Sequence, residues 1–376
     1  MTRADLTPRL VELGQMFSRE VPLVLDAALA LLESIARALA AARLERYELR
    51  DPIGAGGQAE VRAGFVHGTD GFHRPVAIKR LRADHADPER FGSMLVEEAH
   101  RAARLSHPNV VAVLDLGRDA VGQPYLVMEH VAGVDLARLA AAGPVPFPVV
   151  IYIVRELLAA LGYIHAPGDR GRGLVHRDVT PRNVLLSWTG AVKLADFGVA
   201  QVLRSAATAA GACFGSPGYM SPEQARHEPL DGRSDLYAVG IILWELLARR
   251  PLRVGLAGDP EASVTFDQPI PRPSADRASV PADLEAVTLR LLSRDRAGRY
   301  RTADLAARAL LHCPDAPRDG RAELVHLLNA WFPRAERPDP REDPPASGPA
   351  HWAPCHPGRA PWWPRQSRPS RCRTGR

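Results

Sequence analysis

The stretch "LVHRDVTPRNVLL", residues 174–186, places a histidine, an arginine and an aspartate just ahead of an asparagine, with apolar residues on both sides. Asp178 can accept the proton of a hydroxyl group or orient that group. Asn183 and Asp196, the latter in the stretch "LADFGVA", offer the hard oxygen ligands that suit Mg²⁺. Each of these side chains alone would most simply be a helix cap or part of a surface pair. Their order along the chain, together with the other motifs of the sequence, decides against these simpler interpretations.

The composition indicates a folded intracellular protein. The chain has 376 residues, of which 46% are hydrophobic, enough for one large domain or two smaller ones. Its four cysteines lack C-x-x-C spacing, which argues against a disulfide framework or a zinc site and favours a reducing, cytoplasmic location. The net charge of +5 owes much to arginines near the C-terminus, so no nucleic-acid partner is expected.

The first 46 residues are predicted to be a helical extension. Their apolar run from Val21 is interrupted by Asp26, Glu33 and Arg37, and charges in mid-membrane are costly, so no membrane span is expected. No secretory signal precedes it. The run is typical of an amphipathic helix that packs on its own domain or, alternatively, mediates self-association.

The other end of the chain has a different composition. Residues 333–376 are dense in proline and arginine with almost no aliphatic residues, which predicts a disordered tail. A short helix is expected before it, over residues 316–332. No internal repeat is present, and the folded region is therefore expected to span about residues 47–332, with its main domain over residues 47–315.

The folded region changes character near Gly133. Up to that point, short β-like runs alternate with glycine turns and one helix, expected from about Pro88 to Leu105; beyond it, long helical segments predominate. This pattern predicts an α+β fold with a small β-rich lobe, residues 47–128, a larger helical lobe, residues 132–315, and a cleft between the two.

Two motifs of the first lobe suggest phosphate binding. In "IGAGGQAEV", residues 53–61, the glycines let the backbone approach a phosphate closely. In "VAIK", residues 76–79, strand alternation places Ala77 and Lys79 on one face. A glycine hairpin without a ligand and a solvated lysine are the simpler interpretations of each motif alone. An acidic pair, residues 97 and 98, follows on the next helix.

Taken in order, these motifs resemble those of the protein kinases, specifically the bacterial eukaryotic-like serine/threonine group. The resemblance covers roughly residues 47–311 and implies a two-lobed protein kinase fold. It also implies transfer of the γ-phosphoryl group of ATP, with Mg²⁺, to serine and threonine hydroxyls of proteins, together with autophosphorylation. The sequence does not name the protein substrate.

The resemblance assigns the nucleotide-binding residues. Lys79 would hold the α- and β-phosphates, with Glu98 rather than Glu97 as its ion-pair partner. The glycine loop would cover the phosphates, and the backbone carbonyl of Glu129 and amide of Val131 would bond adenine. Ala77 and Leu185 would pack on the two faces of the adenine ring, and Asp135 would reach the ribose. The full set is Ile53, Gly54, Ala55, Gly56, Gly57, Val61, Ala77, Lys79, Glu98, Glu129, Val131, Asp135 and Leu185.

The larger lobe would carry the chemistry. Asp178 would be the catalytic base, and Asn183 and Asp196 would hold Mg²⁺. His176 would be structural, packing beneath Phe197. Three further residues would be scaffold: a buried pair of Glu223 with Arg299, and Asp235, which would brace the catalytic loop.

The chain departs from the family pattern at Thr180, where serine/threonine kinases usually have a lysine. Losing one charged hydrogen bond costs roughly 1.5–3 kcal/mol, or about 10- to 150-fold in rate. Thr180 can still donate its hydroxyl, and Arg182 can serve as a substitute cation, so both join Asp178 as candidate catalytic residues. Two alternatives remain: a pseudokinase that acts as a nucleotide-binding scaffold, and a small-molecule phosphotransferase of the same fold.

The segment between residues 197 and 223 bears on substrate and regulation. Ser216 stands where serine/threonine kinases usually have a threonine near the catalytic aspartate, although Arg182 before the asparagine is a feature of tyrosine kinases. Arg177 resembles the arginine that pairs with a phosphorylated activation loop. Ser205 and Thr208 are candidate sites, and autophosphorylation is expected at Thr208.

Overall fold

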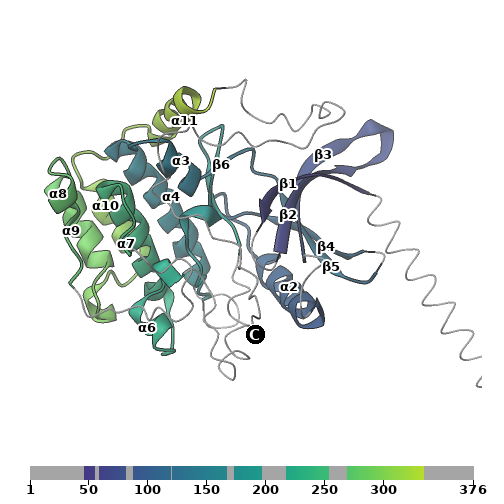
Figure 1. Ribbon diagram of the computed structural model, residues 1–376, viewed down its shortest axis with the longest axis horizontal. Coiled ribbons are helices and arrows are strands. Elements are labelled where there is room, and N and C mark those ends of the chain that lie inside the picture. Colours follow the sequence, from purple (N-terminus) through teal and green to yellow (C-terminus); the bar gives the residue numbers. More distant parts are fainter. Residues whose placement is uncertain are drawn as a thin grey trace, which may run out of the picture. The chain divides into compact units, whose positions relative to one another are not determined.

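The computed structural model describes residues 46–55, 59–81, 88–119, 121–166, 173–196, 217–253 and 269–333. The predicted N-terminal helix and C-terminal tail, and the loop glycines Gly56 and Gly57, lie outside these residues. These described residues divide into two compact units: those up to Val96 with Leu114–Met128, and those of Glu97–Val113 with those from Glu129 onward. The first is rich in strands and the second in helices, which confirms the expected α+β class (Figure 1).

The first unit is built on a five-stranded sheet with the order β1-β2-β3-β5-β4. Neighbouring strands β1, β2 and β3 are antiparallel (Figure 1). The strands are β1 (Tyr47–Ala55), β2 (Ala59–His67), β3 (His73–Leu81), β4 (Val113–Arg118) and β5 (Pro124–Glu129). Helix α2 (Pro88–Ala102) has residues in both units.

Alternation along β3 separates the two faces of this sheet. Val76 and Ile78 are buried in one hydrophobic cluster, which also contains Tyr47, Tyr125 and Val127. Because successive side chains of a strand point to opposite faces, Ala77 and Lys79 lie on the other face. The expected shared face of Ala77 and Lys79 is therefore confirmed.

The second unit is mainly helical and carries a small sheet of order β6-β7-β8. Its strands are β6 (Gly133–Asp135), β7 (Val184–Ser187) and β8 (Val192–Leu194). Its longer helices are α4 (Phe147–His165), α7 (Gly232–Ala248), α9 (Ala282–Leu291), α10 (Ala303–Leu311) and α11 (Gly320–Trp331). The shorter helices are α3 (Leu136–Ala142), α6 (Pro222–Ala225) and α8 (Pro273–Asp276).

Helix α4 forms the centre of this unit. It packs against α7, α10 and α11, and residues such as Val150, Ile151 and Ile153 are fully buried. By length and composition alone α4 could cross a membrane, with a mean hydropathy of 1.7, but 61% of that window is buried inside the protein. Its apolar character is thus explained by its place in the core.

Two helices are shorter than expected. The helix expected to reach Leu105 ends at Ala102, where the Leu105 amide bonds the Ala102 carbonyl in a tight turn ahead of Pro108. The C-terminal helix expected over residues 316–332 spans Gly320–Trp331. Its start is set by Asp319, whose carboxylate accepts a hydrogen bond from the Ala322 amide at 3.0 Å.

Candidate active site

In the first unit, three predicted nucleotide-binding residues lie in one row across the sheet. Gly54 of β1 is opposite Val61 of β2, and Val61 is opposite Lys79 of β3. Residues directly opposite each other share a face, so this row lies on the face away from the hydrophobic cluster. A Cβ at Gly54 would meet the Val61 Cβ at 3.8 Å, an ordinary contact. The face therefore presents a lysine beside a glycine and small apolar side chains.

The acidic pair of α2 is divided between the interior and the surface. Glu98 is 3% exposed, whereas Glu97 forms a surface ion pair with Arg101 at 3.0 Å. The choice of Glu98 as the inward-facing member agrees with this burial. Its pairing with Lys79, which belongs to the other unit, stays a prediction.

The segment expected to meet adenine is anchored by the side chain of Glu129. Its carboxylate accepts hydrogen bonds from the Ala112 amide at 2.8 Å and from Lys193 Nζ at 2.7 Å. Among the described residues, no group bonds the Val131 amide. These contacts use the carboxylate of Glu129 for anchoring and leave the Val131 amide available to a ligand.

Asp135 and Leu185 lie side by side, since they are opposite each other in the β6–β7 pair. Asp135 also caps α3, accepting a hydrogen bond from the Arg138 amide at 2.7 Å. Burial raises the pKa of the Asp135 carboxyl above its ordinary value, against the opposing effects of this hydrogen bond and of Arg182. The carboxylate expected at the ribose is thus held by the start of a helix.

The predicted base and a predicted metal ligand are joined directly. Asn183 Nδ2 donates hydrogen bonds to the Asp178 backbone carbonyl at 2.8 Å and to Asp178 Oδ2 at 3.1 Å. This bond was not predicted from the sequence; the amide of Asn183 reaches back five residues to hold the Asp178 carboxylate. With Nδ2 engaged, the amide oxygen of Asn183 is the atom left to ligate a metal.

Asp196 is linked to the same loop through the backbone. The Ala195 amide donates to the Asn183 carbonyl at 2.8 Å, and Asp196 itself has φ of 60°, in the left-handed region. Such a conformation in a residue other than glycine is uncommon and needs support from its surroundings. The two predicted metal ligands therefore belong to one hydrogen-bonded arrangement.

His176 is fixed as a neutral ring. Its Nε2 lies 3.1 Å from the Ala195 carbonyl, to which it can only donate, and its Nδ1 accepts from the Asp178 amide at 3.4 Å. Burial lowers the pKa of His176 and outweighs the neighbouring carboxylates. These bonds fit the structural role expected for His176, because they occupy both ring nitrogens.

The buried carboxylate of Asp235 braces the catalytic loop, as predicted. It accepts hydrogen bonds from the backbone amides of His176 at 2.8 Å and Arg177 at 2.7 Å. A third bond, from His165 Nε2 at 2.7 Å, was not expected from the sequence. Burial would raise the pKa of Asp235, but these partners hold it below its ordinary value.

Thr180 and Arg182 differ in exposure. Thr180 is 4% exposed, whereas Arg182 is exposed. The charge of Arg182 acts on the Asp135 carboxyl and the Tyr219 hydroxyl, lowering pKa values that burial raises. The charge of Arg182 is thus felt at the predicted ribose contact and at Tyr219, ahead of α6.

Comparison with known proteins gives the family of this chain. Residues 47–311 match the family described as "Protein kinase domain".

The chain belongs to the protein kinase family.

The relatives of this kinase are bacterial. It is 38% identical to the serine/threonine-protein kinase PknB of Mycobacterium leprae over 304 residues, which cover 78% of this chain and 44% of PknB. It is 39% identical to a probable serine/threonine-protein kinase of Streptomyces coelicolor, over 76% of this chain and 42% of that protein. The chain therefore spans less than half the length of these relatives. Their names support the serine/threonine kinase hypothesis and not the pseudokinase alternative.

A solved structure supports the fold. The kinase domain of PknI of Mycobacterium tuberculosis is 30% identical, with a TM-score of 0.54 over 70% of this chain and 95% of that domain. The expected two-lobed protein kinase fold is thereby confirmed.

The segment "SPE", residues 221–223 of this kinase, is tied to the catalytic loop by a residue that was not predicted from the sequence, Gln224. Gln224 Nε2 donates to the Arg177 carbonyl at 2.8 Å, and Gln224 also completes a capping box with Ser221 at the start of α6. The spacing S-x-x-Q signals the cap. Nothing in the sequence signals the bond to Arg177, because it joins residues 47 positions apart.

The predicted pair of Glu223 and Arg299 is confirmed. Arg299 Nη1 and Nη2 donate to the two carboxylate oxygens of Glu223 at 2.6 and 2.9 Å, and both side chains are buried. The Ser234 hydroxyl adds a third bond to Glu223 at 2.7 Å. Burial raises the pKa of Glu223, but the bonds from Arg299 and Ser234 outweigh it and leave the pKa below its ordinary value.

Several predicted positions lie outside the described residues. They are Gly56 and Gly57 of the glycine loop, Phe197, Ser216 and the phosphorylation candidates Ser205 and Thr208. Within the described residues, no group of three or more His, Cys, Asp and Glu side chains forms another metal site.

Proposed function

We propose that this kinase transfers the γ-phosphoryl group of Mg-ATP to serine and threonine hydroxyls of proteins, its own chain included. The observation that carries the proposal is the pair of hydrogen bonds from Asn183 to Asp178, which hold a base and a metal ligand in one loop. Bound Mg-ATP supplies the phosphoryl group and neutralises part of its charge. Asp178 orients the attacking hydroxyl and accepts its proton.

The residues present fit a nucleotide. Gly54 offers no side chain beside Val61, and Lys79 extends from the same face of the sheet. Leu185 and Asp135 lie together, one suited to a ring face and the other to a ribose hydroxyl. The amide oxygen of Asn183 with the carboxylate of Asp196 matches the few protein ligands that Mg²⁺ usually takes.

Arg182 is proposed to supply the cation that Thr180 lacks. Its side chain is exposed, and its charge is felt at Asp135 and at Tyr219. A cation whose charge reaches both Asp135, the predicted ribose contact, and Tyr219, ahead of α6, can act on the transferring phosphate or on the substrate. Thr180, at 4% exposure, is proposed to contribute through its hydroxyl alone.

An intracellular site of action and self-association through the N-terminal helix are proposed from the sequence. The cysteine spacing and the amphipathic run after Val21 support them. Sedimentation of the full chain beside a chain that lacks residues 1–45 tests the second. The same oligomeric state for both chains would contradict it.

Transfer and binding can be separated with three chains. Wild type, Asp178→Asn and Lys79→Met are incubated with γ-labelled ATP, Mg²⁺ and a generic protein substrate, while ATP affinity is measured by calorimetry. We expect Asp178→Asn to lose about 100- to 10,000-fold in rate with its ATP affinity retained. Lys79→Met should lose both. Wild type that binds ATP without protein-directed transfer would establish the scaffold alternative.

A further inference from the structure

Helix α11 lies beyond the part of the chain that matches the kinase family, residues 47–311, yet it is packed firmly on the second unit. Leu324 and Leu328 are fully buried. Gly320 rests against the ring of Tyr152 of α4 so closely that a Cβ would lie 2.5 Å from the Tyr152 Cβ. Besides α4, this appended helix contacts one element of the small sheet.

That element is the β7–β8 turn, residues 187–191. Arg321 Nε donates a hydrogen bond to the Thr189 carbonyl at 2.9 Å, and the Tyr152 hydroxyl donates to the Gly190 carbonyl at 2.9 Å. Gly190 has φ of 81°, and a Cβ there would lie 2.8 Å from Arg321 Cγ and 2.9 Å from Val325 Cγ2. The turn is therefore in close contact with the first half of α11.

The other end of α11 contacts the same turn. The ring of Phe332, directly after α11, lies 6.2 Å from that of Trp188 and beneath the guanidinium of Arg138 at 5.4 Å. The Trp188 amide donates to the Ala132 carbonyl at 2.9 Å, one residue from the expected adenine contact at Val131. Both ends of the helix thus hold the turn that follows β7.

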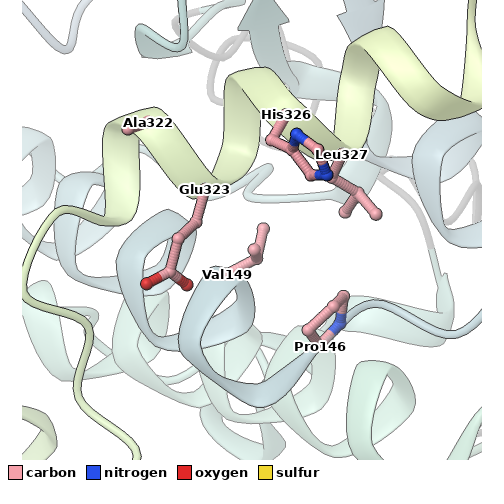
Figure 2. Close-up of a pocket in the computed structure, with 6 residues that line it drawn as sticks. All are labelled: Pro146, Val149, Ala322, Glu323, His326 and Leu327. Atoms are coloured by element: carbon pink, nitrogen blue, oxygen red, sulfur yellow. The ribbon is translucent and has the colours of Figure 1, made fainter.

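The opposite side of α11 is packed less tightly. Figure 2 shows Ala322, Glu323 and His326 of α11 above Pro146 and Val149 at the start of α4. With Leu327, these residues line a cavity of about 360 Å³. The close contacts of α11 therefore include the β7–β8 turn, Tyr152 and, through Trp331, the residue Gly143 directly after α3.

The turn joins the two strands of a hairpin whose other ends lie next to Asn183 and close to Asp196 in the sequence. β7 starts directly after Asn183, and β8 ends two residues before Asp196. The hairpin pairs Val184 with Leu194 and Leu186 with Val192. A one-residue slip would move each side chain to the other face, and small shifts at the turn pass along the paired strands to both ligands.

We propose that α11 is a positioning element for the metal ligands, with Arg321 as the positioning residue that holds the β7–β8 turn. The proposal rests on the proposed function, in which Asn183 and Asp196 bind Mg²⁺. Arg321 touches neither ligand; it acts through the Thr189 carbonyl and the hairpin. Removing it loosens the spacing of the ligands without removing either one.

The test measures metal binding directly. Mn²⁺ is titrated into the full chain with a non-hydrolysable ATP analogue and followed by electron paramagnetic resonance. We expect Arg321→Ala to weaken Mn²⁺ binding about three- to tenfold, less than the 10- to 100-fold typical of groups bonded to a ligand itself. Gly190→Ala, which disturbs the same contact from the turn, should act in the same direction.

The controls separate positioning from folding. Arg321→Lys keeps a donor for the Thr189 carbonyl and should restore most of the affinity. Arg318→Ala, at an exposed arginine three residues earlier, should bind Mn²⁺ like wild type. Unchanged Mn²⁺ affinity in Arg321→Ala, or equal losses in Arg321→Ala and Arg318→Ala, would overturn the proposal, as would wild type that binds no Mn²⁺. Wild type that binds Mn²⁺ but transfers no phosphate would instead contradict the proposed function alone.

Discussion

Thr180 and Arg182, two residues apart in the catalytic loop, divide burial and charge between them. Thr180 is almost fully covered, while Arg182 is exposed and its charge acts on Asp135 and Tyr219. A lysine in the usual position would combine reach and charge in one side chain. Here the charge belongs to Arg182, two residues further along the chain. The effect of Thr180 on the rate of transfer therefore depends on how much Arg182 replaces the lysine.

Arg182→Ala tests that division. If Arg182 supplies the missing charged contact, its loss costs roughly 1.5–3 kcal/mol, which lowers kcat about 10- to 150-fold. Adding Thr180→Lys to Arg182→Ala should recover part of this loss. Steady-state kinetics at saturating Mg-ATP measure both variants. An Arg182→Ala enzyme with the kcat of wild type would show that the charge is not used.

Glu245 makes stability depend on pH. It is buried, accepts hydrogen bonds from the Tyr219 hydroxyl at 2.7 Å and the Leu252 amide at 3.0 Å, and burial raises its pKa to about 7 despite these bonds. The folded state therefore binds a proton that the unfolded state releases above a pKa of about 4.5. Stability from this group is full at lower pH and is lost as the pH rises towards 7.

Glu245→Gln should remove this dependence. The amide imitates the neutral carboxyl, so the fall in unfolding free energy between about pH 4.5 and 7, roughly 3 kcal/mol for wild type, should largely disappear. Denaturant unfolding at several pH values measures it. Equal slopes for the two proteins would contradict the assignment to Glu245.

At the scale of elements, buried polar contacts connect segments that lie far apart in the sequence. Glu223 of α6 pairs with Arg299 and with Ser234 of α7, and Gln224 of α6 bonds the catalytic loop at Arg177. Breaking a buried pair leaves an uncompensated charge, which is more costly than the pair itself is stabilising. The short helix α6 therefore depends on these bonds.

Arg299→Ala should lower the unfolding free energy by about 3–5 kcal/mol. Replacing both partners, with Glu223→Gln and Arg299→Met, should cost less than Arg299→Ala alone, since no buried charge is left unpaired. Arg301→Ala, at an exposed arginine two positions later, is the matched control. Thermal unfolding measures all three. A double variant as unstable as Arg299→Ala, or less stable, would contradict a direct pair.

The strand and helix faces that carry the candidate site were predictable from the sequence, because burial follows the period of each element. Strand alternation placed Ala77 and Lys79 on one face, and spacing selected Glu98, which is buried, over Glu97, which pairs at the surface. The hydrogen bonds of His165 to Asp235 and of Asn183 to Asp178 were not predicted from the sequence. Such bonds depend on how the backbone folds back on itself, which the spacing of apolar residues along the sequence does not predict.

At the scale of the whole molecule, two units carry different parts of the predicted site. The sheet of the first unit carries Lys79 and Gly54, and the second carries Asp178, Asn183 and Asp196. The fold class was predictable from the change of pattern near Gly133, but the sequence placed residues 97–113 in the β-rich lobe, whereas they belong to the second unit. The contacts of α11 were not predictable, because the sequence indicated only a short helix over residues 316–332 and not the turn that this helix contacts.

Nucleotide binding should stabilise the whole chain. A ligand at 100 times its dissociation constant adds about 2.7 kcal/mol, so Mg-ADP should raise Tm for wild type and Asp178→Asn alike. Lys79→Met should show little shift at the same concentration. Differential scanning fluorimetry measures this. A Tm of wild type that is indifferent to Mg-ADP would contradict the nucleotide site.

The most direct test of serine/threonine phosphoryl transfer by this chain is mass spectrometric mapping of phosphosites. The full chain and a generic protein substrate are incubated with Mg-ATP, beside the Asp178→Asn chain. We expect phosphoserine and phosphothreonine on the substrate and on wild type, with Thr208 among the sites, and none above background with Asp178→Asn. Wild type that binds Mg-ATP yet leaves both proteins unmodified, or that modifies only tyrosine, would contradict the account.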